Sequence, residues 1–118
     1  MIKVLIVDDS LTVRAQTKKL IAAELHDSEF VLASSGEEAV KILDEHIFDI
    51  CIIDYNMDGM TGLDLAREIL KRDQDGDLYL CTANSQSVIK EQCLELGIGF
   101  MEKPLDIERV VAPFKIGA

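Results

Sequence analysis

The sequence predicts an α/β fold in which helices cover both faces of a parallel β-sheet. Two observations support this prediction. The chain contains five short apolar segments, each typical of a buried strand, and these segments alternate strictly with segments of helical periodicity. Parallel strands joined by right-handed helical crossovers are the arrangement that such an alternation produces. No linker, repeat or low-complexity segment interrupts the pattern, so we expect residues 1–118 to form one domain.

Each expected strand is a short apolar run bounded by polar residues. In the third strand, Ile50, Cys51, Ile52 and Ile53 follow one another without a polar residue before Asp54. A strand that is apolar on both faces is typical of a sheet buried on both sides. The five expected strands are Lys3–Asp8, Glu29–Ser34, Asp49–Asp54, Asp77–Thr82 and Ile98–Lys103.

The segments between the strands carry the signals of helix ends. Ser10 and Asn84 are each suited to cap a helix start. Residues 35–38 and 61–64 both have the capping-box spacing, and Gly97 stands where a helix is expected to end. Residues at helical spacing predict buried faces on the third and fourth helices, namely Leu63, Ala66 and Leu70, and Ile89, Cys93 and Leu96.

Composition excludes several classes of function. The net charge of −10 argues against a protein that binds a nucleic acid backbone, which requires a basic face. No apolar run approaches the roughly 20 residues of a membrane span, so we expect no membrane insertion. Met1 leads directly into a strand without a secretory signal pattern, which favours the cytoplasm. The cysteines, three in number, form no CxxC pair, so Cys51 and Cys81 are interpreted as small buried apolar residues.

Polar side chains gather where four of the five expected strands end. In a parallel sheet these ends lie along one edge, and ligands bind there. Any one of these residues has an ordinary structural explanation, such as a turn, a cap or a solvated surface charge. Their combination at one edge indicates a functional site. The residues are Asp8 and Asp9 after the first strand, Asp54 and Asn56 after the third, Thr82 at the fourth, and Lys103 at the fifth.

Three carboxylates at one edge repel one another, by about 4 kcal/mol for each pair at 4 Å and an effective dielectric constant near 20. One lysine does not offset three such charges, so either a carboxyl group stays protonated or a divalent cation binds. Oxygen ligands that leave room for water favour Mg²⁺. Asp54 is placed to attack phosphorus, Lys103 to neutralise phosphoryl oxygens, and Thr82 to donate a hydrogen bond to one of them.

The sequence resembles the receiver domains of two-component response regulators, including those of the chemotaxis type. The matching segments span nearly the whole chain, in the family's order and spacing. They are VLIVDDS at Val4–Ser10, ASSGEEAV at Ala33–Val40, IIDYNMDGMTGLDL at Ile52–Leu65, LCTAN at Leu80–Asn84 and GFMEKPL at Gly99–Leu105.

The resemblance implies a flavodoxin-like, doubly wound, five-stranded parallel sheet of strand order 2-1-3-4-5. It implies that Asp54 accepts a phosphoryl group from a phosphohistidine. The Mg²⁺ ligands would then be Asp8, Asp9, Asp54 and the backbone carbonyl of Asn56. Thr82 and Lys103 would contact the phosphoryl group, and the bond from Lys103 to the following proline would be cis.

The resemblance also implies a switch and its partners. Thr82 would move toward the phosphoryl group and Phe100 would turn inward as the switch aromatic. The alternative interpretation of Phe100 is a plain core residue. Asn56 and Asn84 would influence the lifetime of the acyl phosphate. The expected partners are a sensor histidine kinase or a phosphotransfer protein, and a downstream effector protein in chemotaxis or a phosphorelay. We expect no direct DNA binding and no enzymatic activity beyond the domain's own phosphorylation and dephosphorylation.

Three positions depart from the family pattern. Asp58 stands where proline is usual and adds a carboxylate to the loop after Asp54. Residues 75–77 precede the fourth strand with Asp-Gly-Asp, where proline is common. Pro113 falls within the expected fifth helix, so we expect that helix to stop near Ala112.

Two other functions compete with the phosphorylation switch. One is an aspartyl-phosphate phosphatase of the haloacid-dehalogenase type, suggested by Asp54 and Asn56 at a spacing of two. That class uses a second acid to protonate the leaving group, which Asn56 cannot do. The other is a pseudo-receiver that acts by binding alone, against which the complete set of Asp54, Thr82 and Lys103 argues.

Overall fold

The computed structural model describes residues 1–72, 75–83 and 87–115. Strands and helices alternate along this chain, and a short 3₁₀ helix follows the last α-helix. The elements are β1 (Ile2–Val7), α1 (Leu11–Glu24), β2 (Ser28–Ala33), α2 (Gly36–Leu43), β3 (Ile50–Asp54), α3 (Gly62–Lys71), β4 (Asp77–Thr82), α4 (Ser87–Leu96), β5 (Gly99–Glu102), α5 (Ile107–Val111) and η1 (Ala112–Phe114).

The five strands form one parallel sheet in the order β2-β1-β3-β4-β5. This is the flavodoxin-like topology, so the predicted fold class and strand order are confirmed. Every expected strand is present, with bounds shifted by no more than one residue at either end. The first two strands both begin one residue earlier than expected because the ladder already pairs Ile2 with Ser28.

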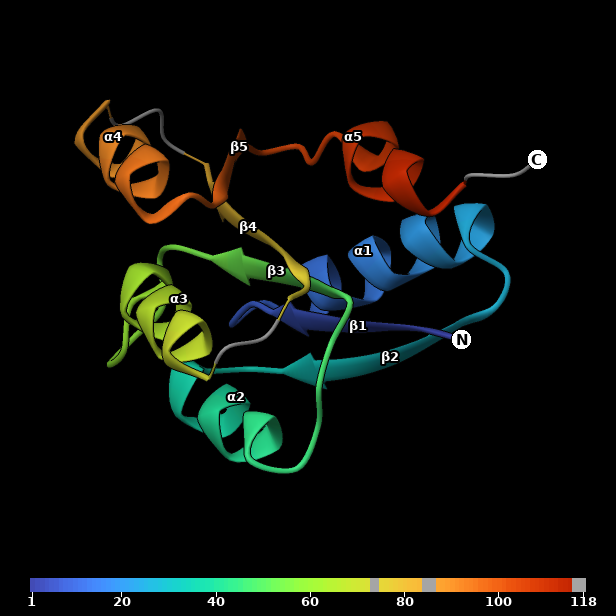
Figure 1. Ribbon diagram of the computed structural model, residues 1–118, viewed down its shortest axis with the longest axis horizontal. Helices are drawn as coiled ribbons and strands as arrows, with labels where there is room; N and C mark the ends of the chain where they lie inside the picture. The colour runs from blue at the N-terminus through green and yellow to red at the C-terminus, as the bar shows by residue number, and fades with distance from the viewer. Residues whose placement is uncertain (73–74, 84–86, 116–118) are drawn as a thin grey trace.

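The sheet is covered on both faces, as Figure 1 shows, with α1 and α5 on one side and α2, α3 and α4 on the other. Side chains alternate between the two sides along each strand. Val4 and Ile6 of β1 pack in the cluster beneath α1 and α5, whereas Leu5 and Val7 pack in the cluster beneath the other three helices. This double burial explains why the strands are apolar at nearly every position.

Side chains cap the helix starts largely as expected. The Ser10 hydroxyl accepts a hydrogen bond from the backbone N–H of Val13, which starts α1. Thr61 forms the predicted reciprocal capping box with Asp64 at the start of α3. At α2 the prediction was only half right, because the Glu38 carboxylate accepts from the N–H of Ser34 instead of Ser35. Asn84 lies outside the described residues.

The predicted helix ends are confirmed, but the predicted buried face of α3 was wrong at one residue. Gly97 ends α4 with a φ of 75°, and α5 gives way to η1 before Pro113, both as predicted. Leu70, expected on the buried face of α3, is 40% exposed. Ile69 is buried in its place because the inward face of α3 is centred one residue earlier than the apolar spacing suggested.

A close backbone approach fixes the loop that follows Asp54. Gly62, the first residue of α3, donates its N–H to the carbonyl of Tyr55 over 3.1 Å. A Cβ atom on Gly62 would lie 2.3 Å from the backbone oxygen of Asp54 and 2.8 Å from the Cα of Tyr55. Only a glycine therefore lets α3 begin this close to the carboxyl end of β3.

We predict that Gly62→Ala lowers the free energy of unfolding by about 2 kcal/mol, because the added methyl meets rigid backbone. Helix propensity alone predicts the opposite sign, a gain of about 1 kcal/mol. Urea denaturation monitored by circular dichroism measures the change. Gly97→Ala is the comparison, since its Cβ meets nothing within 4 Å and its cost comes from the positive φ alone. A Gly62→Ala variant more stable than the wild type would contradict the steric argument.

Candidate functional site

The residues predicted to meet at the carboxyl ends of the strands do meet there. Asp8 and Asp9 directly follow β1, Asp54 and Thr82 end β3 and β4, and Lys103 follows β5. Asp8 and Asp54 are only 4% and 6% exposed, and Thr82 is fully buried, whereas Asp9 is exposed. The sheet therefore holds two carboxylates and a hydroxyl in a largely desolvated position beside one accessible carboxylate.

Lys103 links the two buried carboxylates. Its Nζ lies 2.9 Å from Oδ2 of Asp8 and 3.1 Å from Oδ1 of Asp54. Burial alone would lower the pKa of Lys103, but the hydrogen bonds to Asp8 and Asp54 outweigh that effect and raise it above its usual value. The peptide bond between Lys103 and Pro104 is cis, as the resemblance implied.

The three carboxylates form a tight cluster. Asp8, Asp9 and Asp54 each offer one oxygen within 4.8 Å of the others. The pKa of Asp54 is raised, first by its burial and then by the neighbouring Asp8 and Asp9, and Lys103 offsets this only in part. The site therefore carries more negative charge than its lysine neutralises. Such a set of oxygen ligands, one of them open to water, fits a hard divalent cation.

The loop after β1 is held by three hydrogen bonds at Asp8. The backbone N–H of Asp8 donates to the carbonyl of Ala33 over 3.1 Å, and its Oδ1 accepts from the N–H of Ser10 over 2.9 Å. Nη1 of Arg14 donates to the Asp8 carbonyl over 2.7 Å. The sequence reasoning missed Arg14. Its position four residues after the Ser10 cap was the available signal, because it places a cation in the first turn of α1.

The polar residues beyond the strand ends occupy different positions. Nδ2 of Asn56 lies 3.4 Å from Oγ1 of Thr82 and donates to it, so the loop after β3 contacts the end of β4. Phe100 is half-buried in β5 and packs against the core cluster that contains Ile89 and Cys93 of α4. Asp58 is exposed and does not belong to the carboxylate cluster found among the described residues. Asn84 lies in the part of the chain that is not described.

A cavity of about 360 Å³ opens beside the cluster. Asp8, Asp54 and Lys103 line it on one side, and apolar side chains that include Val13 of α1 and Leu105 line the other. Cys81 also borders this cavity, but burial raises the pKa of its thiol to about 12. A thiol with so high a pKa stays protonated at neutral pH.

Comparisons with known proteins identify relatives over nearly the whole chain. The family described as "Response regulator receiver domain" matches residues 4–115. The chain is 33% identical over 115 residues to the chemotaxis protein CheY of Listeria monocytogenes, covering 94% of this chain and 93% of that protein. It is also 33% identical over 110 residues to CheY of Thermotoga maritima, with 92% and 91% covered.

Solved structures share the fold. The chemotaxis protein CheY4 of Vibrio cholerae superposes with a TM-score of 0.81 at 25% identity, covering 98% of this chain and 97% of that one. The response regulator protein TrrA of Thermotoga maritima, solved in complex with Mg²⁺-BeF, superposes with a TM-score of 0.79 at 28% identity and the same coverage. None of the helices in the described residues has the length and apolar character that crossing a membrane requires.

The raised pKa of Asp54 predicts a pH-dependent gain in stability for Asp54→Asn in metal-free protein. Above the folded pKa, the wild type carries a buried, repelled carboxylate that the amide removes, so the variant has the larger free energy of unfolding. As the pH falls through the folded pKa toward the ordinary value of 3.8, wild-type Asp54 takes up a proton and the gain disappears.

Urea denaturation in EDTA between pH 3.5 and pH 8 checks this expectation. Asp58→Asn is the matched control, because it removes one exposed carboxylate from the same loop. If Asp54→Asn were more stable by the same amount across this pH range, or less stable than the wild type at pH 7, the electrostatic destabilisation assigned to the Asp54 carboxylate would be contradicted.

Proposed function

Because this chain belongs to the response regulator receiver domain family, we propose that it is a phosphorylation-activated signalling switch whose phosphoryl acceptor is Asp54. The observation that carries the proposal is the contact of one lysine, Lys103, with Asp54 and Asp8 together, next to the exposed Asp9. In this arrangement the carboxylate of Asp54 already contacts the ammonium group of Lys103. We further propose that residues 1–118 make up this receiver domain.

In the proposed reaction, one oxygen of Asp54 attacks the phosphorus of a phosphohistidine. The new O–P bond forms as the N–P bond breaks, and the bonding electrons leave with the imidazole nitrogen of the donor. No general base is needed because the nucleophile is already an anion. The product is an acyl phosphate on Asp54, whose phosphoryl oxygens Lys103 contacts through its ammonium group.

The same carboxylates are the proposed Mg²⁺ ligands. Asp8, Asp9, Asp54 and the backbone carbonyl of Asn56 would hold the ion, which supplies neutralisation of charge on the transferred phosphoryl group. Support comes from the three carboxylate oxygens within 4.8 Å and from the incomplete compensation of their charge by Lys103. The response regulator protein TrrA, which is 28% identical to this chain, has been solved in complex with Mg²⁺-BeF.

Thr82 and Phe100 are the proposed switch. The Thr82 hydroxyl accepts from Asn56 in this structure, and a phosphoryl group on Asp54 would offer it an acceptor at the same edge. Movement of Thr82 would then let Phe100 change position in β5. Asn56 and Asn84 are the residues proposed to influence the lifetime of the acyl phosphate.

The proposed partners follow from the same chemistry. A sensor histidine kinase or a phosphotransfer protein would supply the phosphoryl group, and an effector protein in chemotaxis or a phosphorelay would read the altered surface. The domain would act in the cytoplasm without binding DNA, and it would promote only its own phosphorylation and dephosphorylation. A phosphatase of the haloacid-dehalogenase type is not favoured, because Asn56 donates its amide to Thr82 and offers no acid.

Incubation with acetyl phosphate and Mg²⁺ should add one phosphoryl group to the protein, detected as a mass increase of about 80 Da by intact mass spectrometry. EDTA should abolish the increase because the carboxylate charge is then uncompensated. Asp54→Asn should remain unmodified under the same conditions. Phosphorylation that persists in folded Asp54→Asn would contradict the assignment of Asp54 as the acceptor. A folded wild type that shows no mass increase would favour the pseudo-receiver.

Asp9→Asn should weaken Mg²⁺ binding by about tenfold or more, because the exposed carboxylate is a proposed direct ligand. Isothermal titration calorimetry measures the dissociation constant directly. Asp58→Asn removes an equal charge from an exposed position outside the cluster and should change the constant by less than about threefold. Equal effects of the two substitutions would argue that Mg²⁺ responds only to the overall charge of this edge.

A further inference from the structure

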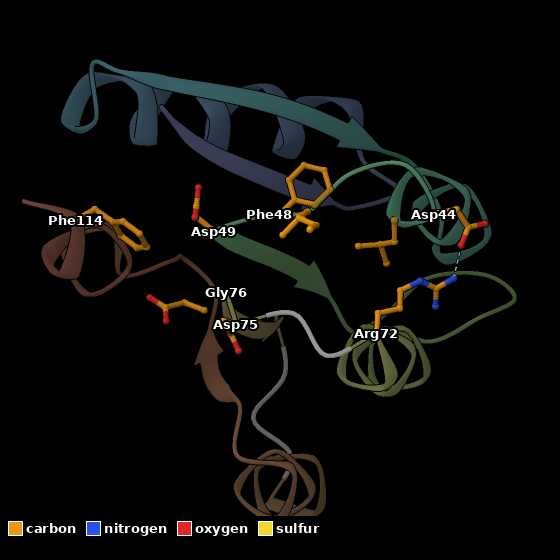
Figure 2. A pocket seen from close by; sticks show the side chains of 10 residues that line it. Asp44, Phe48, Asp49, Arg72, Asp75, Gly76 and Phe114 are labelled. Atoms are coloured by element: carbon orange, nitrogen blue, oxygen red, sulfur yellow. Dashed lines mark hydrogen bonds and ion pairs between the residues drawn. The ribbon is translucent and has the colours of Figure 1, made fainter.

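A second cavity, of about 570 Å³, lies at the opposite edge of the sheet, around the amino ends of β3 and β4 (Figure 2). Asp49, directly before β3, and Asp77, the first residue of β4, both line it. At about 3.3 Å per residue, the length of β3 separates this edge from Asp54 by on the order of 16 Å. That exceeds the screening length of about 8 Å at physiological salt, so the two edges are electrostatically independent at their surfaces.

Of the three departures from the family pattern, the segment 75–77 lines this cavity and Pro113 directly precedes a residue that lines it. Gly76, in the segment before β4, packs against the backbone of Phe48, where a Cβ atom would lie 2.2 Å from the Phe48 oxygen. Pro113 lies in η1, the 3₁₀ helix that follows the short α5, and the next residue, Phe114, lines the cavity. Figure 2 shows Phe114 on one side of the cavity, with Asp49 and Asp75 between it and Arg72.

The charge around the cavity is strongly unbalanced. Arg72 is the one cationic side chain among the described lining residues. Its Nη2 lies 2.6 Å from Oδ1 of Asp44 and its Nη1 lies 3.1 Å from Oε2 of Glu68, so its charge is already paired. None of the ion pairs between described residues involves the other three lining carboxylates, which belong to Asp49, Asp75 and Asp77.

Apolar side chains lie next to these carboxylates. Ile47 is 73% exposed, and Phe114 is half-buried. The cavity is therefore an open groove with an apolar wall and an acidic rim. A small molecule in such a groove would leave much of its surface in water, whereas bound small molecules are usually buried over most of theirs. A chain segment can cover the groove and its rim together.

We propose that this groove docks a basic segment of a partner protein. The segment places one bulky apolar side chain against Ile47 and Phe114, and its lysine or arginine residues pair with Asp75 and Asp77. The charge complementarity excludes anionic partners such as nucleic acid and acidic membrane surfaces. This proposal does not rest on the proposed phosphorylation switch, because the groove lies at the edge of the sheet away from Asp54.

The position of the groove predicts that docking does not depend on the state of Asp54. A partner held at the amino ends of the strands leaves the carboxylate cluster open to a phosphoryl donor. The protein would thus keep its partner bound while the opposite edge is modified. Binding at the groove would raise the effective concentration of that partner near the carboxylate cluster.

The test uses a fluorescein-labelled peptide with one central phenylalanine flanked on each side by two arginines. Fluorescence anisotropy without Mg²⁺ or phosphoryl donor should give saturable binding. Amide shifts in ¹⁵N-labelled protein should cluster at Ile47, Gly76, Asp77 and Phe114. Replacement of the arginines by glutamates should abolish binding. Replacement of the phenylalanine by glycine should weaken it at least threefold.

The double variant Asp75→Asn/Asp77→Asn should weaken binding by about three- to tenfold, the effect of losing two exposed ion pairs. The control Glu91→Gln/Glu95→Gln removes the same charge from exposed positions on α4 and should leave the affinity within twofold. No binding, equal weakening by both double variants, or shifts centred on the carboxylate cluster would each overturn the proposal.

Discussion

The candidate site depends on one shared ammonium group. Lys103 contacts the two buried carboxylates, Asp8 directly after β1 and Asp54 at the end of β3, whose mutual repulsion in a desolvated site would otherwise be uncompensated. The compensation is incomplete, because Asp9 adds a third carboxylate and the pKa of Asp54 stays raised. The carboxylate cluster thus keeps an excess of negative charge that an added cation would offset. The two apolar layers of the sheet supply the stability that this unfavourable charge requires.

The parallel sheet separates two kinds of chemistry along its strands. Its carboxyl edge gathers buried charges that contact one another, and its amino edge carries an open groove with carboxylates and apolar side chains. This separation follows from topology, since every strand points in the same direction. The proposed modification at one edge and the proposed docked segment at the other therefore do not compete for the same residues.

The apolar strands and the polar residues that end them were predictable from the sequence, because strands buried on both faces are apolar throughout and parallel pairing brings their ends to one edge. The contacts that depend on how elements pack were not predictable. Leu70 was placed on the wrong face because helical spacing does not show where α3 meets its neighbours. Gly62 resembled an ordinary residue of a capping sequence, although it permits the approach of α3 to Asp54. Arg14 and the groove at Phe114 depend on contacts between residues distant in the chain.

The most direct test of the shared-charge account is a crystal structure of the protein soaked with Mg²⁺ and beryllofluoride, a mimic of a bound phosphoryl group. The account predicts beryllium bonded to an oxygen of Asp54, one Mg²⁺ among the carboxylates of Asp8, Asp9 and Asp54, and the ammonium of Lys103 within hydrogen-bond distance of a fluoride. A beryllofluoride on another residue, or a Mg²⁺ bound away from these three carboxylates, would contradict it.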